Sequence, residues 1–547
     1  MVRAAALGIL SVVFAACSSD ESPSAPVDAG CLVDPCEPDG SLDQSMCAAI
    51  RGNGDRVFAH FASLARIVEH YGPLDGAAGG SSGSITIFLT ESIQSHPLVD
   101  DCGGVACSER ERADRIALLL KSLPGYAYAL ADTPEALAVQ HLLPLIERVQ
   151  EEGIVALLET DIFEARDALL ALLESDDVRE LINPEVLDLL VESEDPTFHI
   201  VDIVSELQNF GSFAADDPAI LVRPGVLDFE AFAEMLGRIG SFYAGRGPVD
   251  DDRMQAFLSD CAGAGRGLPW ADIAEFPAEE GTCGAMFHEL VTVWREGWLD
   301  EDADYASRID DPVGRDLPAL VSTSVLQGEA VTVFEQARAD YIAAEPLSLD
   351  GIDFDDIRFG YWGAASDLGR VIANPHGFDD AKTAKMVSLG EATWREALSL
   401  SPAEPGLARA LAIDETHVSA GGWSDLHPVL ALRNLGCDEV VYVTRRGAES
   451  RFAQGVATLL GMGESERVEL YDLDGPSSFT RSLEEADAVY CTDWDNMPAL
   501  DLEVMSEHAY NAPLETTSAF FAAGDDAYPN IVERTGEPGC TAGVAPE

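Results

Sequence analysis

The chain has 547 residues, of which 97 are acidic and 33 are basic, giving a formal net charge of −64. So few cations cannot neutralise phosphates along a groove, which excludes nucleic acid as a partner and disfavours electrostatic docking on an anionic bilayer. An apolar content of 47% is ample for a large core. We therefore expect a globular protein with an acidic, solubilising surface.

The first residues are typical of an export signal. Arg3 precedes an apolar run over residues 4–16 that is too short to cross a bilayer as a helix. The run ends in a pattern similar to the lipobox of bacterial lipoproteins, with Phe14 in place of the usual leucine and Cys17 as the residue that would be lipidated. We expect an exported bacterial lipoprotein of the cell envelope, held at the membrane through Cys17. The alternative is plain secretion after cleavage near Ala16.

Cysteine usage agrees with export. Of eleven cysteines, setting aside Cys17 leaves ten, an even number that suits an oxidising compartment. No cysteine pairs stand at the spacing of a structural zinc site, so we expect no metal. Close spacing makes three local disulfides plausible, although the connectivity stays open: Cys31–Cys36, Cys102–Cys107 and Cys261–Cys283.

The segment after the N-terminal region predicts the opening of a parallel α/β sheet. Residues 46–50 form a short apolar strand that leads into the glycine-rich loop 52–56. Residues 57–71 place apolar side chains at helical spacing, and a small-residue stretch over 72–80 leads to Ser81. The order strand, loop, helix, strand, turn and helix is that of an α/β fold.

Ser81 is the strongest candidate for a reactive residue. It lies in Gly79-Gly80-Ser81-Ser82-Gly83, a G-x-S-x-G pattern that between a strand and a helix forces the serine into a strained, exposed turn. There its hydroxyl can attack an acyl carbon, and the glycine-rich loop can offer backbone N–H groups to the oxyanion that forms. Taken alone, the pattern is equally compatible with an ordinary small-residue loop.

The middle of the chain has a different character. From about residue 100 to residue 311, amphipathic stretches predict helices with few strands, which indicates a helical insertion or cap that would gate or shape an acyl pocket. The predicted helices cover residues 113–123, 134–158, 163–173, 184–191 and 229–242. The α/β pattern then returns, with predicted strands at 317–325, 330–334, 439–443, 468–471 and 486–491.

These patterns together predict an α/β core interrupted by the insertion. The expected divisions are a signal peptide (1–16), a flexible tether (17–42), the first part of the core (43–100), the helical insertion (101–315), the second part of the core (316–500) and a C-terminal tail (501–547).

Four segments, in order, resemble the patatin-like phospholipase family. They are an oxyanion loop at 52–57, in which Asn53 and Val57 replace glycines and Arg56 matches; the nucleophile elbow at 79–83; a small-residue segment at 399–407; and a Gly-Gly…Pro segment at 421–428. The resemblance covers residues 46–95 and 316–495. It implies a three-layer α/β/α domain with a helical insertion.

The resemblance also implies an activity, the hydrolysis of acyl esters in phospholipids or other lipids. Ser81 would be the nucleophile, and no cofactor would be needed. The oxyanion would be bound at Gly52, Asn53, Gly54, Arg56 and Ser82.

The most consequential departure from the family concerns its catalytic base. Members of the family use a Ser–Asp dyad, in which the aspartate stands directly before two glycines. In this chain that position is occupied by Ala420, whose side chain cannot accept a proton. A carboxylate from elsewhere is one substitute, and we prefer Asp425 because it lies in the same post-glycine loop. Other carboxylates are weaker choices: Asp414, Asp493 and Asp495.

Two further interpretations stay open. His427 or His417 could serve as the base, or the protein could be a catalytically weakened relative that binds lipid or a protein partner. Asp425 itself could instead be a helix N-cap before Pro428 or a simple surface charge.

Overall fold

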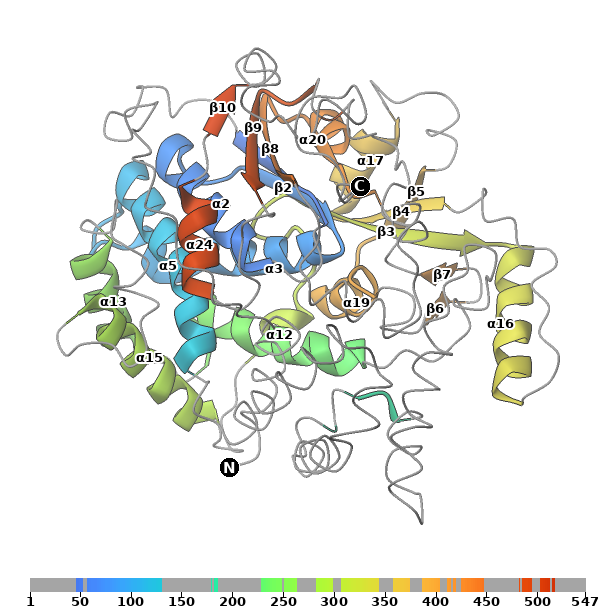
Figure 1. Cartoon of the computed structure of the whole chain (residues 1–547), viewed down its shortest axis with the longest axis horizontal. Helices are drawn as coiled ribbons and strands as arrows, with labels where there is room; N and C mark the ends of the chain where they lie inside the picture. The colour runs from blue at the N-terminus through green and yellow to red at the C-terminus, as the bar shows by residue number, and fades with distance from the viewer. Residues whose placement is uncertain are drawn as a thin grey trace, which may run out of the picture.

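The computed structural model of the protein is shown in Figure 1. It describes residues 46–52, 57–129, 179, 182–184, 228–247, 250–262, 282–298, 306–343, 358–373, 386–403, 411–414, 417–419, 425–446, 482, 485–493, 502–511 and 514–516. The predicted signal peptide and tether lie outside the described residues, as do the predicted helices over 134–158 and 163–173 and the predicted strand over 468–471. The predicted helix over 184–191 also lies outside them except for its first residue.

Within the described residues, ten strands form one mixed, mostly parallel sheet, so the predicted α/β class is confirmed. Eight strands follow one another in the order β10-β9-β8-β1-β2-β3-β4-β5, while β7 pairs with β3 and with β6. The run from β9 to β3 is parallel throughout. The strands are β1 Met46–Ile50, β2 Gly76–Gly80, β3 Ala319–Gln327, β4 Arg358–Trp362, β5 Met386–Gly390, β6 Leu411–Asp414, β7 His417–Ser419, β8 Glu439–Arg446, β9 Ala488–Asp493 and β10 Leu514–Thr516.

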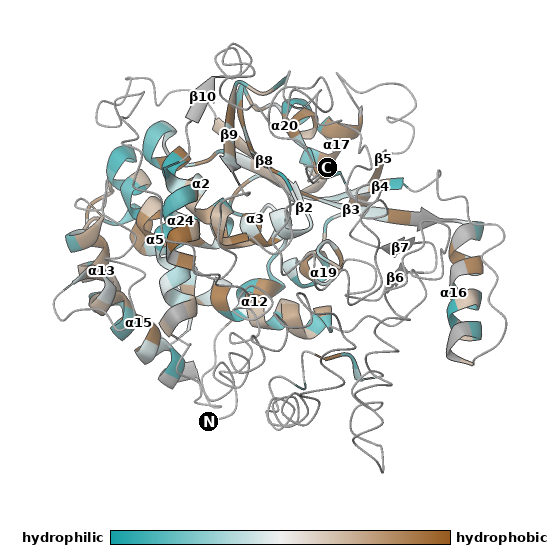
Figure 2. Cartoon of the chain, viewed as in Figure 1, coloured by the Kyte–Doolittle hydropathy of each residue, from teal (hydrophilic) through white to brown (hydrophobic). Residues whose placement is uncertain are grey.

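Helices cover both faces of this sheet. The described helices are α2 Val57–Tyr71, α3 Ser82–Gln94, α4 Pro97–Asp100, α5 Glu109–Ala129, α12 Phe229–Tyr243, α13 Asp251–Cys261, α15 Cys283–Trp298, α16 Glu329–Ile342, α17 Ala365–Ala373, α19 Trp394–Leu400, α20 Val429–Leu435, α24 Leu502–Tyr510 and the 3₁₀ turn η3 Arg308–Asp310. Outer helices such as α13 and α15 carry both hydrophilic and hydrophobic residues (Figure 2), because one side of each faces the core and the other faces solvent.

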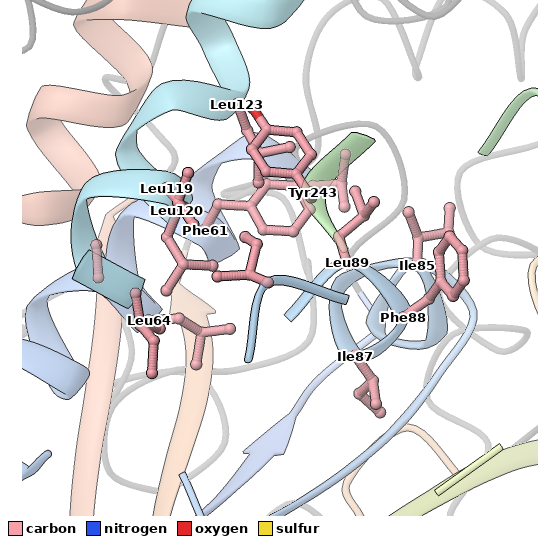
Figure 3. Packing of buried hydrophobic residues seen from close by; sticks show 14 of the residues in the cluster. Phe61, Leu64, Ile85, Ile87, Phe88, Leu89, Leu119, Leu120, Leu123 and Tyr243 are labelled. Atoms are coloured by element: carbon pink, nitrogen blue, oxygen red, sulfur yellow. The ribbon is translucent and has the colours of Figure 1, made fainter. Parts of the chain in front are cut away.

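The larger face of the sheet carries the main hydrophobic core. Alternate residues of β1, Ala48 and Ile50, point to this face, where they join side chains of α2, α3, α5, α12, α13, α15, α19 and α24 in one buried cluster. Figure 3 shows part of it, with Phe61 of α2 and Phe88 of α3 among aliphatic side chains of α3 and α5. We call this side the larger face.

The opposite side of the sheet, the smaller face, has a core of its own. The intervening β1 residues, Cys47 and Ala49, point to it together with Val440 of β8 and Leu320 of β3. Two short helices, α17 and α20, pack on this face and on each other. The sheet therefore separates two cores of unequal size.

Helix α3, which follows Ser81, is buried along its whole length. Its hydroxyl side chains form hydrogen bonds with the backbone of the same helix. The hydroxyls of Thr86, Thr90 and Ser92 donate to carbonyls four residues earlier, at 3.1, 2.7 and 2.7 Å. Such back-bonding lets polar residues enter a core without leaving donors unpaired. Helix α3 is therefore a fixed support behind the serine.

A buried ion pair joins α3 to the end of the predicted insertion. Glu91 and Arg308 are both fully buried, and their charged groups lie 2.8 Å apart. The carboxylate of Glu91 also accepts a hydrogen bond from the backbone N–H of Asp316 at 3.0 Å. Burial raises the pKa of Glu91, and the positive charge of Arg308 opposes that rise.

The described helices of the predicted insertion pack within the larger face. Helix α5 lies along α2, α12 packs on α3 and α19, and α15 packs on α5. The helices expected over 113–123 and 229–242 are confirmed as α5 and α12. None of the helices in the described part of the chain is long and apolar enough to cross a membrane.

Most of the predicted elements in the described core are confirmed, and one is wrong. The strand expected over residues 330–334 is the first part of helix α16. The short run of Val331, Thr332 and Val333 suggested a strand, but helix-forming residues continue to Ile342, and Val331 and Ala337 are the buried positions. Gly328, with φ +65°, makes the turn between β3 and α16.

Two of the three expected local disulfides are confirmed, and a third bond is new. Cys102 pairs with Cys107 and Cys261 pairs with Cys283, while Cys31 and Cys36 lie outside the described residues. The long-range bond joins Cys47 of β1 to Cys437, which lies two residues before the start of β8, across 390 positions of sequence. It ties the first and the last parts of the sheet together.

Candidate active site

Ser81 lies at the sharp turn between β2 and α3, as its sequence pattern predicts. Its backbone has φ 53° and ψ −129°, and it is the only non-glycine residue with a positive φ in the described parts of the chain. A backbone in this region costs of order 1–3 kcal/mol, so the surrounding structure must hold it. This strained turn is the geometry of a nucleophile elbow.

The glycines on either side of Ser81 are needed for close packing. A Cβ atom on Gly79 would lie 2.9 Å from the carbonyl oxygen of Ile50, and one on Gly83 would lie 2.8 Å from the same oxygen. Real Cβ atoms essentially never approach so closely. The G-x-S-x-G pattern therefore lets the elbow pack directly against the end of β1.

Gly52 brings the end of β1 to the serine. A Cβ atom on Gly52 would lie 3.2 Å from Cβ of Ser81 and 2.6 Å from Cδ2 of Leu426. The start of the predicted oxyanion loop thus passes between the elbow and the residue that follows Asp425. Asn53, Gly54 and Arg56, the other predicted residues of this loop, lie outside the described residues.

Ser82, the remaining predicted oxyanion residue, is the first residue of α3 and is buried. Backbone N–H groups at a helix N-terminus point outward and favour negative charge, so this is a suitable place for an oxyanion donor. Ser81 itself is only 5% exposed. The prediction that Ser81 is exposed is therefore wrong, because other residues cover the elbow.

A set of buried hydrogen bonds runs from the elbow to Asp425. The backbone N–H of Ser81 donates to Oγ of Ser401 at 3.0 Å, and that hydroxyl donates to the carbonyl of Ser322 at 2.7 Å. The hydroxyl of Ser322 donates in turn to the backbone carbonyl of Asp425 at 2.6 Å. We call Ser401, Ser322, Asp425 and Tyr361 the buried polar network.

This network crosses the sheet. Ser401 directly follows α19, which packs on the larger face, whereas the side chain of Ser322 shares the smaller face with its strand neighbour Tyr361. Ser322 therefore binds groups on both sides, one through its carbonyl and the other through its hydroxyl.

The carboxylate of Asp425 is held by two donors on the smaller face. The hydroxyl of Tyr361 donates to Oδ2 at 2.7 Å, and the backbone N–H of His427 donates to Oδ1 at 3.1 Å. Burial, and then the negative charge of Asp425, raise the pKa of Tyr361 well above its ordinary value. The tyrosine therefore stays protonated and donates to the carboxylate.

Both simple explanations of Asp425 are wrong. The residue is fully buried, which excludes a surface charge. Helix α20 begins at Val429 with Pro428 as its N-cap residue and no side-chain cap, which excludes the predicted N-cap role. A buried carboxylate is costly unless charged or polar groups surround it, so its retention here calls for a reason.

His427 is also buried, and its ring is already engaged. Its Nδ1 lies within hydrogen-bond distance of the hydroxyl of Tyr442 in β8, and its backbone carbonyl accepts from Ser482 at 2.8 Å. These contacts fix the loop that carries Asp425. They support a structural role for His427 next to the carboxylate.

The strand register separates the other candidate bases from the strand positions next to the elbow. His417 pairs with Gln327, five residues along β3 from Ser322, the partner of Gly80. At about 3.3 Å per residue these positions are roughly 16 Å apart. Asp414 belongs to the same β6–β7 hairpin, and Asp493 pairs with Arg446 beyond the end of β1.

Three residues of the network escaped prediction from the sequence. Ser401 lies in the small-residue segment at 399–407, but its sequence position does not disclose a contact with Ser81 across 320 residues. Ser322 and Tyr361 occupy adjacent strands that pair antiparallel. Only the topology of the sheet brings them to Asp425.

The positions of Ala420, Cys17 and Asp495 lie outside the described residues. Among the residues that the structure does describe, no group of three or more His, Cys, Asp or Glu side chains could hold a metal ion. Comparison of the sequence and structure with family models, curated proteins and solved structures finds no match.

Proposed function

We propose that this protein is a serine-dependent acyl-ester hydrolase with Ser81 as its nucleophile. The observation that carries the proposal is the strained backbone of Ser81 at a strand-to-helix turn, braced by close-packed glycines. Holding a serine in such a conformation costs folding free energy, and backbone strain of this kind is concentrated at functional sites. Hydrogen bonds that run from the same turn to the backbone carbonyl of Asp425, a residue with a buried carboxylate, add to the support.

The proposed chemistry needs only groups of this chain. Oγ of Ser81 attacks the ester carbonyl carbon while its proton passes to the carboxylate of Asp425. Backbone N–H groups at Gly52 and Ser82, with those of Asn53, Gly54 and Arg56, bind the resulting oxyanion. The alcohol leaves with the proton from Asp425, and water then cleaves the acyl-serine by the same steps in reverse.

The finer parts of the proposal rest on resemblance. We propose a three-layer, patatin-like α/β/α domain with a helical insertion, acting on a phospholipid or another lipid ester. Lipidation of Cys17 would bring the enzyme to its substrate at the cell envelope. No cofactor takes part in this scheme.

A second candidate is a non-catalytic relative that binds lipid or a protein partner at the same place. Two observations favour it. Ala420 stands where the related enzymes carry their base, and Ser81 is only 5% exposed. A serine without a base loses several orders of magnitude in rate, which would leave binding as the remaining function.

The test is hydrolysis of short p-nitrophenyl esters and of a labelled phospholipid, together with labelling by a fluorophosphonate probe. The wild type is compared with Ser81→Ala, Asp425→Asn and Ala420→Asp. We expect Ser81→Ala to abolish both activity and labelling, and Asp425→Asn to lower kcat by about 10³-fold or more, as the loss of a catalytic base does.

The outcomes separate the two candidates. An active wild type whose activity survives Asp425→Asn would keep Ser81 and reject Asp425 as the base. A wild type that neither hydrolyses nor labels, and that Ala420→Asp activates, would support the binding protein instead.

A further inference from the structure

We infer that Ser401 is a positioning residue for Ser81, one that holds the strained elbow in its reactive shape. The inference rests on the proposed function and adds a residue to it. It starts from the contacts of a single hydroxyl group, which is fully buried at the end of α19.

The hydroxyl of Ser401 makes two hydrogen bonds of opposite sense. It accepts from the backbone N–H of Ser81 at 3.0 Å and donates to the carbonyl of Ser322 at 2.7 Å. A hydroxyl is one of the few small groups that can accept and donate at once. Alanine at this position would leave a buried donor and a buried acceptor unpaired.

Three other buried serines in the described helices bond in a different way. The hydroxyls of Ser63, Ser92 and Ser399 each donate to the carbonyl four residues earlier in their own helix, at 2.9, 2.7 and 2.8 Å. Such bonds are local and stabilise only the helix that makes them. The hydroxyl of Ser401 instead reaches two other elements, the elbow after β2 and the strand β3.

The target of this contact is the residue that most needs support. Because Ser81 alone among the described non-glycine residues has a positive φ, its backbone would relax if its N–H lost its partner. A turn of the peptide plane would displace Oγ of Ser81, and displacements of about 1 Å can cost roughly 100-fold in rate.

The same contact links the nucleophile to the proposed base. Ser322 accepts from Ser401 through its carbonyl and donates to the backbone of Asp425 through its hydroxyl. One residue of β3 therefore fixes the elbow on one side of the sheet and the Asp425 loop on the other. Loss of Ser401 would free the elbow from this common support.

The experiment compares Ser401→Ala, Ser401→Thr and the matched control Ser399→Ala in the full chain. Ser399 is two residues away in the same helix and loses a buried hydroxyl of the ordinary kind. We measure kcat and KM on a short p-nitrophenyl ester, the rate of fluorophosphonate labelling, and hydrogen exchange of the Ser81 amide.

We expect Ser401→Ala to lower kcat and the labelling rate by about 10-fold to 100-fold with KM changed less than about 2-fold. The Ser81 amide should exchange faster in this variant. Ser401→Thr, which keeps the hydroxyl, should recover most of the rate, and Ser399→Ala should match the wild type. Ser401→Cys, which keeps the volume but is a weak donor and acceptor, replaces Ser401→Ala if that variant melts below the assay temperature.

Wild-type kcat and labelling in Ser401→Ala would overturn the inference, and so would an equal loss in Ser399→Ala. If the wild type neither labels nor hydrolyses, the proposed function fails, and amide exchange still decides about Ser401. Faster exchange of the Ser81 amide in Ser401→Ala but not in Ser399→Ala would support the positioning role of Ser401. Unchanged exchange in Ser401→Ala would reject that role.

Discussion

The two faces of the sheet are stabilised in different ways. On the larger face, helices from α2 to α24 bury a continuous apolar core, and the charged groups inside it are paired, as Glu91 is with Arg308. On the smaller face, two short helices cover a small core that also holds a disulfide and the acidic part of the buried polar network. The larger face is stabilised mainly by the burial of apolar side chains, whereas the disulfide and hydrogen bonds contribute more to the stability of the smaller face.

The difference explains where the candidate site lies. The larger face supplies a rigid support, since α3 is buried on all sides behind Ser81. The smaller face accepts a carboxylate, because Tyr361 and the backbone of His427 provide its donors. Ser322 lies between the two environments, since its carbonyl binds Ser401 beside the elbow and its hydroxyl binds the backbone of Asp425.

The largest expected effect is on the smaller face. Replacing Cys47 and Cys437 by serine opens a loop of 390 positions, which on chain-entropy grounds lowers the free energy of unfolding by about 6 kcal/mol. Chemical denaturation measures the loss, and hydrogen exchange should show α17 and α20 opening before α2 and α3.

The matched control is the double serine variant of Cys102 and Cys107, which closes a loop of only 5 positions and should cost about 2 kcal/mol. Equal losses in the two double variants, or uniform opening of both faces, would contradict the idea that the smaller face depends on its disulfide.

An intermediate effect is expected on the larger face, at His96. Burial, and then the positive charge of Arg115, lower the pKa of His96 to about 4, and its Nε2 has no hydrogen-bond partner. The unfolded chain binds a proton near pH 6.5 and the folded protein does not, so stability falls as pH drops from about 6.5 to about 4. The loss over this window is about 3 kcal/mol.

His96→Asn should remove that part of the pH dependence, because asparagine can still accept from the N–H of Leu98 and does not titrate. Unfolding free energies measured between pH 4 and pH 7 test this, with the partly exposed His70→Gln as control. Parallel curves for His96→Asn and the wild type would contradict the prediction.

The smallest effect on stability is expected from Tyr361→Phe. Loss of a hydrogen bond to a carboxylate costs about 2 kcal/mol. Because the ionised form of Asp425 loses a donor, the acidic limb of the pH profile of kcat/KM should move to higher pH.

Tyr490→Phe is the matched control on the larger face. Its hydroxyl is equally buried and donates to the carbonyls of Ala509 and Tyr510, so it should cost similar stability without moving the pH profile. An unmoved profile in Tyr361→Phe would separate Asp425 from catalysis.

The sequence predicted elements that local patterns define. The strand over 46–50 and the helix over 57–71 are confirmed residue for residue, because the first is a short apolar run and the second has apolar residues at helical spacing that end before Gly72. The run over 330–334 was misleading, because three consecutive β-branched residues within it favour a strand, whereas the helix-forming residues after them favour a helix. Strands β4 and β5 were not predicted, although β4 contains the aromatic residues that favour a strand.

The candidate site divides in the same way. Ser81 and its glycines follow from a local pattern, because the strain and the close approach arise within a few residues. The buried polar network does not, since Ser322, Tyr361 and Ser401 reach Asp425 and Ser81 only through strand pairing and helix packing. Contacts across hundreds of residues leave no local trace.

The small residues around the elbow affect how a mutational scan of this segment should be interpreted. Strand β2 consists of Gly-Ala-Ala-Gly-Gly, and larger side chains at Gly79 or Gly83 would collide with the carbonyl of Ile50. A saturation scan selected for folded protein alone would therefore mark residues 76–83 as intolerant, whatever the protein does. In that window the exchange of Ser81 for alanine removes one oxygen and adds no bulk, so it reports on chemistry separately from folding.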